Sequence, residues 1–293
     1  MTIVSSNFDA DPMFPVACNT PAPITIVVPC YNEASRLDAA AFQTYIDTRN
    51  DVSFLFVDDG SRDDTLECLS TLQATRPHRI TVLSLSQNSG KAEAVRQGLI
   101  FATNAGAQLV GYWDADLATP LDAIDDFVRV ANKFQDVSVV FGSRRALLGH
   151  RIERTLKRRM VSRLCAVLAR QAVRLPLGDT QCGAKLLRNT GDLRDALKSP
   201  FTAGWLFDVE LFARLSARMP KGRCAFYEQP LCEWDEIPGS KVSGSAIVKS
   251  GMRMLRLIAE TRFGLPALQN EMQAVPVARV VDAPKTPTFG WVN

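Results

Sequence analysis

Two aspartates, Asp114 and Asp116, stand one residue apart where the apolar run VGYW ends. Carboxylate oxygens are the ligands that Mg²⁺ and Mn²⁺ prefer, and such a cation commonly keeps substrate phosphate among its ligands. We therefore interpret the pair as a site for Mg²⁺ or Mn²⁺ that holds a substrate diphosphate. The alternative is a helix cap, because Asp116 and Thr119 precede Pro120 and a helical stretch.

Apolar runs alternate with helical stretches along the first half of the chain. This alternation predicts an α/β fold with a mostly parallel central sheet, flanked by helices on both faces. The expected strands are ITIVVP, SFLFVDD, ITVLSLS, LVGYWDAD and VSVVFGSR. The expected helices cover residues 35–49, 63–75, 90–105 and 120–134.

Polar residues follow each of these strands. In open α/β sheets, ligands bind beyond the carboxyl ends of the strands, so one site would explain all of these residues together. Separate caps and turns would have to explain them one by one. The chain has no GxGxxG after the first strand and no GxxxxGK[ST], which disfavours dinucleotide-binding and P-loop proteins. The strand-end groups are Pro29–Glu33, Asp58–Ser61, Asn88–Lys91, Asp114–Asp116 and Gly142–Arg144.

Composition excludes several other classes of protein. The 293 residues are 46% hydrophobic with a net charge of +3, which is ordinary globular composition and gives no indication of a nucleic-acid partner. The seven cysteines form no CxxC pair and only two histidines are present, so neither a Cys/His zinc site nor a Ser-His-Asp mechanism is expected. Scattered free thiols suit a reducing cytoplasm. The sequence contains no stretch of about 18 apolar residues, so we predict no membrane-spanning helix.

The second half contains two amphipathic stretches, 150–176 and 242–264, and the first is rich in arginine. Each is either a core helix with a solvated face or a surface helix that lies on an anionic membrane. We expect a flexible leader over 1–23, one domain over 24–264 and a flexible tail over 265–293.

A set of motifs in the first half resembles glycosyltransferase family 2. The motifs are PCYNEASRL, VDDGSRDDT, NSGKAEAVRQG, DADLATP and GSR, spread over residues 24–145. The resemblance implies the GT-A fold and a nucleotide-sugar donor. Further on, GDTQCGAKLLR, GWLFDVELFARL and EIPGSKVS are similar to the branch that glycosylates polyprenyl phosphates, and within it to the dolichyl-phosphate β-glucosyltransferases. This extends the resemblance to about residue 260.

On the donor side, the resemblance assigns roles to the strand-end residues. One of Asp58 and Asp59 is expected to read the base or ribose, unless both are turn residues. Asp116 would bind the cation most directly, while Asp114 would lie near the ribose or diphosphate. The cation would act as a Lewis acid on the leaving nucleoside diphosphate. The other expected donor contacts are Pro29, Tyr31 and Glu33 around the nucleoside and Lys91 at the diphosphate.

On the acceptor side, Arg144, Arg158 and Lys241 match family positions that contact acceptor phosphate, and Asp179 and Gln181 match positions near the sugar or acceptor. A phosphate oxygen is already deprotonated at neutral pH, so it needs no general base. A hydroxyl acceptor would need one. Its candidates are Asp208 and Glu210, which are otherwise structural carboxylates.

The resemblance implies an inverting hexosyltransferase that moves glucose from UDP-glucose to a polyprenyl or dolichyl phosphate. Ala118 stands where the mannosyltransferase sibling has a metal-binding Gln, which favours the glucosyl branch over one that uses GDP-mannose. The eukaryotic glucosyl enzyme also carries a membrane span that this chain lacks. We therefore expect a cytoplasmic enzyme, peripheral on the cytoplasmic face of a membrane or joined to a partner that spans it. The alternatives are a soluble family 2 enzyme with a hydroxyl acceptor, a polyprenyl-phosphate mannosyltransferase that uses GDP-mannose, and a nucleotide-sugar sensor without activity.

Overall fold

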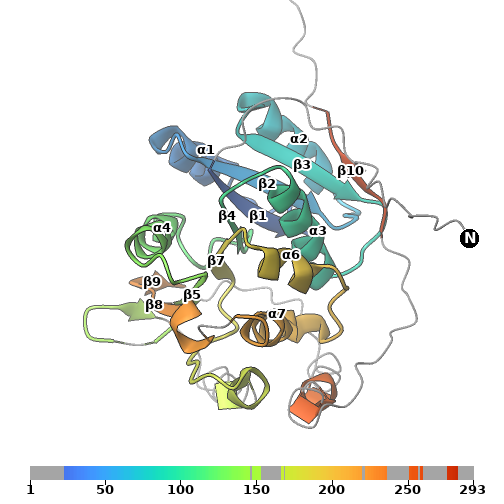
Figure 1. Cartoon of the computed structure of the whole chain (residues 1–293). Helices are drawn as coiled ribbons and strands as arrows, with labels where there is room; N and C mark the ends of the chain where they lie inside the picture. Colours follow the sequence, from blue (N-terminus) through green and yellow to red (C-terminus); the bar gives the residue numbers. More distant parts are fainter. Residues whose placement is uncertain are drawn as a thin grey trace, which may run out of the picture.

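The computed structural model describes residues 23–145, 147–152, 166–167, 169–219, 222–235, 251–256, 258–259 and 276–282. Within them, an eight-stranded mixed sheet forms the centre of the molecule (Figure 1). In spatial order its strands are β10 (Ala278–Val280), β3 (Ile80–Leu85), β2 (Val52–Asp58), β1 (Ile24–Cys30), β4 (Leu109–Trp113), β7 (Ala184–Arg188), β5 (Val139–Ser143) and β8 (Phe226–Pro230).

The five strands predicted from apolar runs are all present. β3, β2, β1 and β4 run parallel to one another, so their carboxyl ends meet at one edge of the sheet. β7 enters between β4 and β5 and is antiparallel to both. A short second sheet pairs β6 (Arg151–Ile152) with β9 (Glu233–Trp234). β7 therefore brings the segment before it, residues 179–183, to the end of β4.

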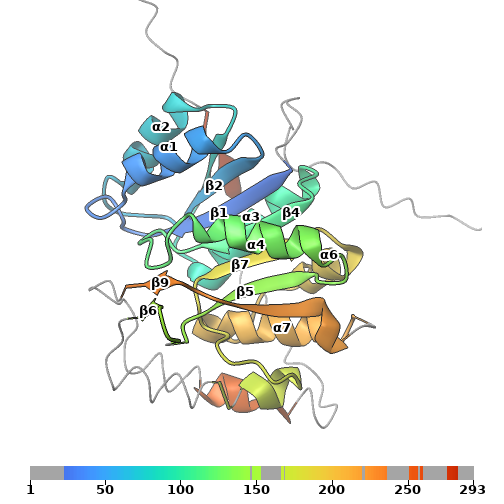
Figure 2. The ribbon, with the colours of Figure 1, turned by 90° about the vertical axis from the view of Figure 1, so that its left-hand side faces the viewer.

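Helices cover both faces of the sheet (Figures 1 and 2). On one face, α1 (Ala39–Thr48), α2 (Thr65–Thr75) and α4 (Ala123–Lys133) pack on Phe54, Phe56 and Trp113. On the other face, α3 (Lys91–Asn104), α6 (Gly191–Leu197) and α7 (Phe207–Ser216) pack on Val27, Leu55 and Tyr112. The strands expose apolar side chains alternately to the two layers, as burial on both faces requires.

The first helix starts later than the sequence predicts. Asp38 caps α1 by accepting a hydrogen bond from the Ala41 amide at 2.9 Å, so the helix begins at Ala39 instead of residue 35. Residues 33–36 instead form a turn after β1. This turn places the Glu33 and Arg36 side chains at the strand-end edge.

The C-terminal region departs from the prediction of a flexible tail. Residues 278–280 form β10, which pairs antiparallel with β3, and Gln73 on α2 donates to the Val281 carbonyl at 3.0 Å. Sequence patterns do not predict this strand, because three residues are too short to show a period. Residues 1–22, 265–275 and 283–293 lie outside the described residues, as does most of both amphipathic stretches. In the part of the chain that the structure describes, no helix combines the length and the apolarity needed to cross a membrane.

Candidate active site

Lys91 and Asp114 meet at the edge where the parallel strands end. Lys91 is the first residue of α3, Asp114 follows β4, and the Lys91 ammonium donates to Asp114 Oδ1. Desolvation opposes the charge on Lys91, but Asp114 and Asp208 outweigh it and raise the pKa of the amine above its usual range. Two residues that are 23 positions apart in sequence thus share one charged contact.

Asp116 lies beside this contact and is partly buried. Desolvation and then the Asp114 charge raise the pKa of its carboxyl group. Arg36 also acts on both aspartates: its bidentate bond to Glu33, followed by the charges of Glu33, Asp116 and Asp114, raises the pKa of the guanidinium. The edge therefore combines two crowded carboxylates with cationic groups from two other strand ends.

Gly183 contacts both the backbone and the side chain of Asp114. The Asp114 amide donates to the Gly183 carbonyl at 3.1 Å. A Cβ atom on residue 183 would lie 1.9 Å from Asp114 Oδ2, far inside any contact distance. Only glycine at this position leaves room for the Asp114 carboxylate as it stands.

Asp58 and Asp59, which the sequence could not distinguish, have different contacts. Asp59 accepts hydrogen bonds from the Ser89 amide at 2.7 Å and the Gly90 amide at 2.8 Å, so both carboxylate oxygens hold the loop before Lys91. Asp58 accepts from the Ser61 amide through Oδ1 at 3.2 Å. Burial raises the pKa of Asp59 to about 6, against these two hydrogen bonds.

Arg144 and Asp179, both predicted acceptor-side residues, bind each other. The guanidinium donates to the carboxylate through Nε at 2.7 Å and Nη2 at 2.8 Å, and it lies 5.2 Å from the Trp234 ring. This bidentate contact neutralises Arg144 in the present structure. Arg158 and Lys241, the other two predicted phosphate contacts, lie outside the described residues.

The segment that follows Asp179 has unused hydrogen-bonding capacity. Thr180 Oγ1 and Gln181 Nε2 are buried and find no hydrogen-bond partner among the described residues. Buried polar groups are normally paired, and an unpaired one costs free energy. These two atoms fit the expectation that this segment meets a ligand.

The two candidate general bases are both engaged in the protein interior. Glu210 accepts from the Thr202 and Ala203 amides at 2.7 Å and from Arg214 at 2.6 Å. Asp208 accepts from the Tyr112 hydroxyl and lies 2.7 Å from the ammonium of Lys185. Neither arrangement leaves a carboxylate ready to take a proton from a hydroxyl acceptor.

The residues at this edge fit a hard divalent cation that completes its shell with substrate oxygens. Asp114 and Asp116 supply carboxylates whose crowding a cation would relieve. No cluster of three or more Asp, Glu, His or Cys side chains occurs in the described part of the chain, so the protein does not offer a full cage there. Mg²⁺ in nucleotide sites is usually held by one or two carboxylates plus phosphate.

Sequence reasoning missed several residues at this site. Arg36 stands within the PCYNEASRL motif, but spacing alone does not show that its turn faces Asp116. Lys185 did leave a signal, since it is a charged residue inside the apolar strand AKLLR. Gly183 left none, because its importance depends on a contact with Asp114, far earlier in the chain.

The order of the described strands, the antiparallel β7 and the paired aspartates after β4 can be compared with known families. The family model described as glycosyl transferase family 2 matches residues 25–193, and the chain belongs to this family. The protein is therefore a glycosyltransferase.

Curated relatives of this chain include several dolichyl-phosphate beta-glucosyltransferases. That of Drosophila melanogaster is 31% identical, with 75% of this chain and 69% of the relative covered. One from Trichomonas vaginalis is 30% identical, with 83% and 75% covered. The human relative is 30% identical, with 75% and 69% covered.

Solved structures share the GT-A fold with this chain. Glucosyl-3-phosphoglycerate synthase from Mycobacterium tuberculosis, crystallised with Mn²⁺, UDP and glucosyl-3-phosphoglycerate, aligns with a TM-score of 0.57 at 19% identity. The alignment covers 84% of this chain and 81% of the synthase. At this identity the likeness concerns the fold alone.

Proposed function

We propose that this glycosyltransferase moves glucose from UDP-glucose to a polyprenyl phosphate, with inversion at the anomeric carbon. The observation that carries the proposal is the contact of Lys91 with Asp114, beside Asp116, where the parallel strands end. The names of the curated relatives support both the sugar and the lipid acceptor. Their coverage reaches well beyond the donor half of the chain.

The donor would lie across the strand ends. Pro29, Tyr31 and Glu33 follow or end β1 and would surround the nucleoside, together with Asp58. Asp59 would act through the loop that it holds, since both of its oxygens are used. Lys91 would meet the diphosphate. Asp114 and Asp116 would hold Mg²⁺ or Mn²⁺, which supplies Lewis-acid stabilisation of the departing diphosphate when bound.

The acceptor would be a phosphate oxygen that attacks without a general base. The engagement of Asp208 and Glu210 in the interior supports this chemistry over a hydroxyl acceptor. Arg144, Arg158 and Lys241 would bind the acceptor phosphate. For Arg144 this requires the phosphate to share or replace the Asp179 carboxylate, to which the guanidinium is already matched.

The proposal is tested with purified protein, radiolabelled UDP-glucose, Mn²⁺ or Mg²⁺, and a polyprenyl phosphate. We expect label in the organic phase, and none when EDTA is added. GDP-mannose runs in parallel. Label from GDP-mannose alone would overturn the sugar and the base while keeping the reaction type. UDP release with an aqueous acceptor, without lipid label, would overturn the lipid acceptor.

Donor affinity is predicted to fall as the pH drops below about 6, because protonated Asp59 can no longer accept both loop amides well. The contribution of Asp59 to folding stability has the opposite dependence on pH. The folded pKa, about 6, lies above the ordinary 3.8, so this carboxyl group favours folding below pH 3.8 and loses that contribution as pH rises through 6.

The measurement is UDP binding by calorimetry from acidic pH up to pH 8. Asp59→Asn, which cannot titrate, should bind UDP more weakly than the wild type at pH 8 and show a flatter pH dependence. An unchanged pH dependence in this variant would exclude Asp59 as the group responsible.

Membrane contact is proposed through the helical residues 251–256 and 258–259. Met254 is fully buried, whereas Met252 and Leu255 are each 60% exposed and stand beside exposed Arg253 and Arg256. This helix and the helical residues 166–167 and 169–173 lie in the lowest layer of the molecule, beneath α7 (Figures 1 and 2). Exposed apolar side chains flanked by arginines suit an anionic lipid surface.

We expect Met252→Ser/Leu255→Ser to weaken sedimentation with anionic liposomes by at least about tenfold, since each side chain would bury apolar area in the lipid. Val277→Ser is the matched control, because Val277 is 74% exposed and directly precedes β10, an edge strand of the large sheet. Equal binding by the double variant and the wild type would argue against this surface.

A further inference from the structure

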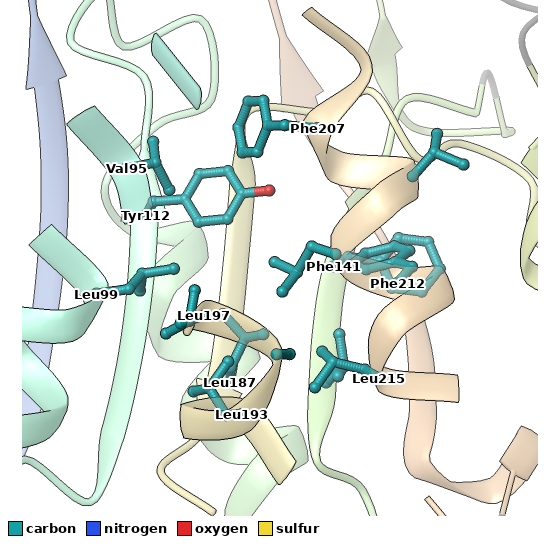
Figure 3. Packing of buried hydrophobic residues seen from close by; sticks show 14 of the residues in the cluster. Val95, Leu99, Tyr112, Phe141, Leu187, Leu193, Leu197, Phe207, Phe212 and Leu215 are labelled. Atoms are coloured by element: carbon teal, nitrogen blue, oxygen red, sulfur yellow. The ribbon is translucent and has the colours of Figure 1, made fainter. Parts of the chain in front are cut away.

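A buried ion pair joins β7 to α7. Lys185 in β7 is fully buried, and its ammonium lies 2.7 Å from Asp208 Oδ1 on α7. The same ammonium donates to the Cys182 carbonyl and lies 5.0 Å from the ring of Tyr112, its partner across the β4–β7 pairing. Tyr112 lies between Val95 on α3 and α7, with its hydroxyl directed toward α7 (Figure 3).

This pair is connected to Asp114 through neighbouring residues of one segment. Lys185 holds the carbonyl of Cys182, and the next residue is Gly183. Gly183 accepts the Asp114 amide and leaves room for the Asp114 carboxylate. A displacement of the Cys182 carbonyl would therefore also displace Gly183, to which the Asp114 amide is hydrogen-bonded.

Attachment of α7 alone does not explain the pair. α7 already packs through Phe207, Phe212 and Leu215 in the apolar cluster of Figure 3. Replacing a buried ion pair with apolar residues is often neutral or stabilising, so packing gives no reason to keep one. What an apolar pair could not provide is the hydrogen bond from Lys185 to the Cys182 carbonyl.

We propose that Lys185 and Asp208 are positioning residues that hold residues 182–183 in place, so that Gly183 fixes Asp114 beside Lys91. Asp208 supplies the counter-charge that keeps the Lys185 ammonium buried, and Lys185 supplies the hydrogen bond. The inference rests on the proposed role of Asp114 and Asp116 in binding the cation and diphosphate. It does not depend on the identity of the acceptor.

The test is the double variant Lys185→Met/Asp208→Asn. It removes both charges together, and the amide oxygen introduced at position 208 can still accept the Tyr112 hydroxyl. We expect a folded protein with a melting temperature close to that of the wild type. The Asp114 amide should exchange with solvent faster, and Mn²⁺ binding in the presence of UDP, followed by electron paramagnetic resonance, should weaken roughly tenfold or more. Turnover should fall, with KM for polyprenyl phosphate unchanged.

The matched control is Arg214→Met/Glu210→Gln, which removes another ion pair from α7. Among the described residues, these two side chains form their other hydrogen bonds with the segment 196–203, and not with residues 182–183. It should keep wild-type exchange at Asp114 and wild-type Mn²⁺ binding, whatever its stability. If the first double variant does not fold, the triple variant Lys185→Met/Asp208→Leu/Tyr112→Phe serves, because it replaces the whole buried polar cluster with apolar side chains, and the same two changes are expected.

Wild-type exchange at Asp114 together with wild-type Mn²⁺ binding in the folded variant would overturn the inference. So would equal losses in the control. Absence of glucosyl transfer by the wild-type protein would instead overturn the proposed function, because amide exchange and Mn²⁺ binding require no acceptor.

Discussion

Asp116→Asn is expected to lower the rate of sugar transfer on the order of a thousandfold while leaving the protein folded. Lewis-acid stabilisation of a leaving diphosphate contributes several kcal/mol, and each ~1.4 kcal/mol corresponds to about a factor of ten. Asparagine keeps the shape of the side chain and its bond to the Ala118 amide but removes the charge. The loss should therefore fall on the cation and the chemistry, and not on the architecture of the loop.

Stability provides the second readout for Asp116→Asn. Desolvation and the neighbouring Asp114 already disfavour the Asp116 carboxylate, as its raised pKa indicates. A neutral side chain at this position should keep or raise the melting temperature at neutral pH. Transfer rates with and without added Mn²⁺, together with a thermal melt, check both expectations. Full activity in this variant would remove the principal argument for a cation at this site.

Gly183→Ala is expected to reduce transfer on the order of a hundredfold, because a misplacement of about 1 Å at a reacting centre can cost that much. The added methyl group would lie 1.9 Å from Asp114 Oδ2 and 2.2 Å from its Cγ. The carboxylate must therefore leave its place beside Lys91. Overpacking of this kind costs about 1–3 kcal/mol of stability, so the protein should still fold.

Gly191→Ala is the control for this substitution. Gly191 is the first residue of α6, and a Cβ atom there meets nothing within 4 Å. Alanine in a helix is more favourable than glycine by about 0.5–1 kcal/mol, so this variant should be as stable as the wild type or more so, with unchanged transfer. Equal transfer by both variants would show that Asp114 tolerates displacement.

The parts of the fold that depend on local patterns could be predicted from sequence. Buried parallel strands such as ITIVVP read as continuous apolar runs, and their ends mark where ligands bind, so Asp114 and Lys91 could be assigned to one edge from their positions in the chain. The place of β7 could not be predicted in this way. An antiparallel strand placed between β4 and β5 is decided by tertiary packing, and no periodicity in AKLLR expresses it.

The candidate site, too, could be predicted only in part from sequence. Residue types and spacing indicated a cation and a diphosphate at Asp114 and Asp116. They could not indicate that both carboxylate oxygens of Asp59 accept hydrogen bonds from the loop before Lys91. Nor could they indicate that Arg144 forms a bidentate ion pair with Asp179. These are pairings between distant segments, and each changes the charge that a substrate would meet. Asp208 illustrates this most clearly, because a carboxylate that could be a base in sequence is paired with a buried lysine in the fold.

The two outermost strands of the large sheet are poorly suited to pairing with a further strand. One outermost strand, β10, is only three residues long, and the last residue of the other, β8, is Pro230. Short edge strands and edge prolines discourage pairing with another chain, because they offer few free amide groups in register. In the described part of the chain, the large sheet therefore offers little edge surface for pairing with another chain, and intermolecular β-pairing becomes a risk chiefly when β10 is detached from β3.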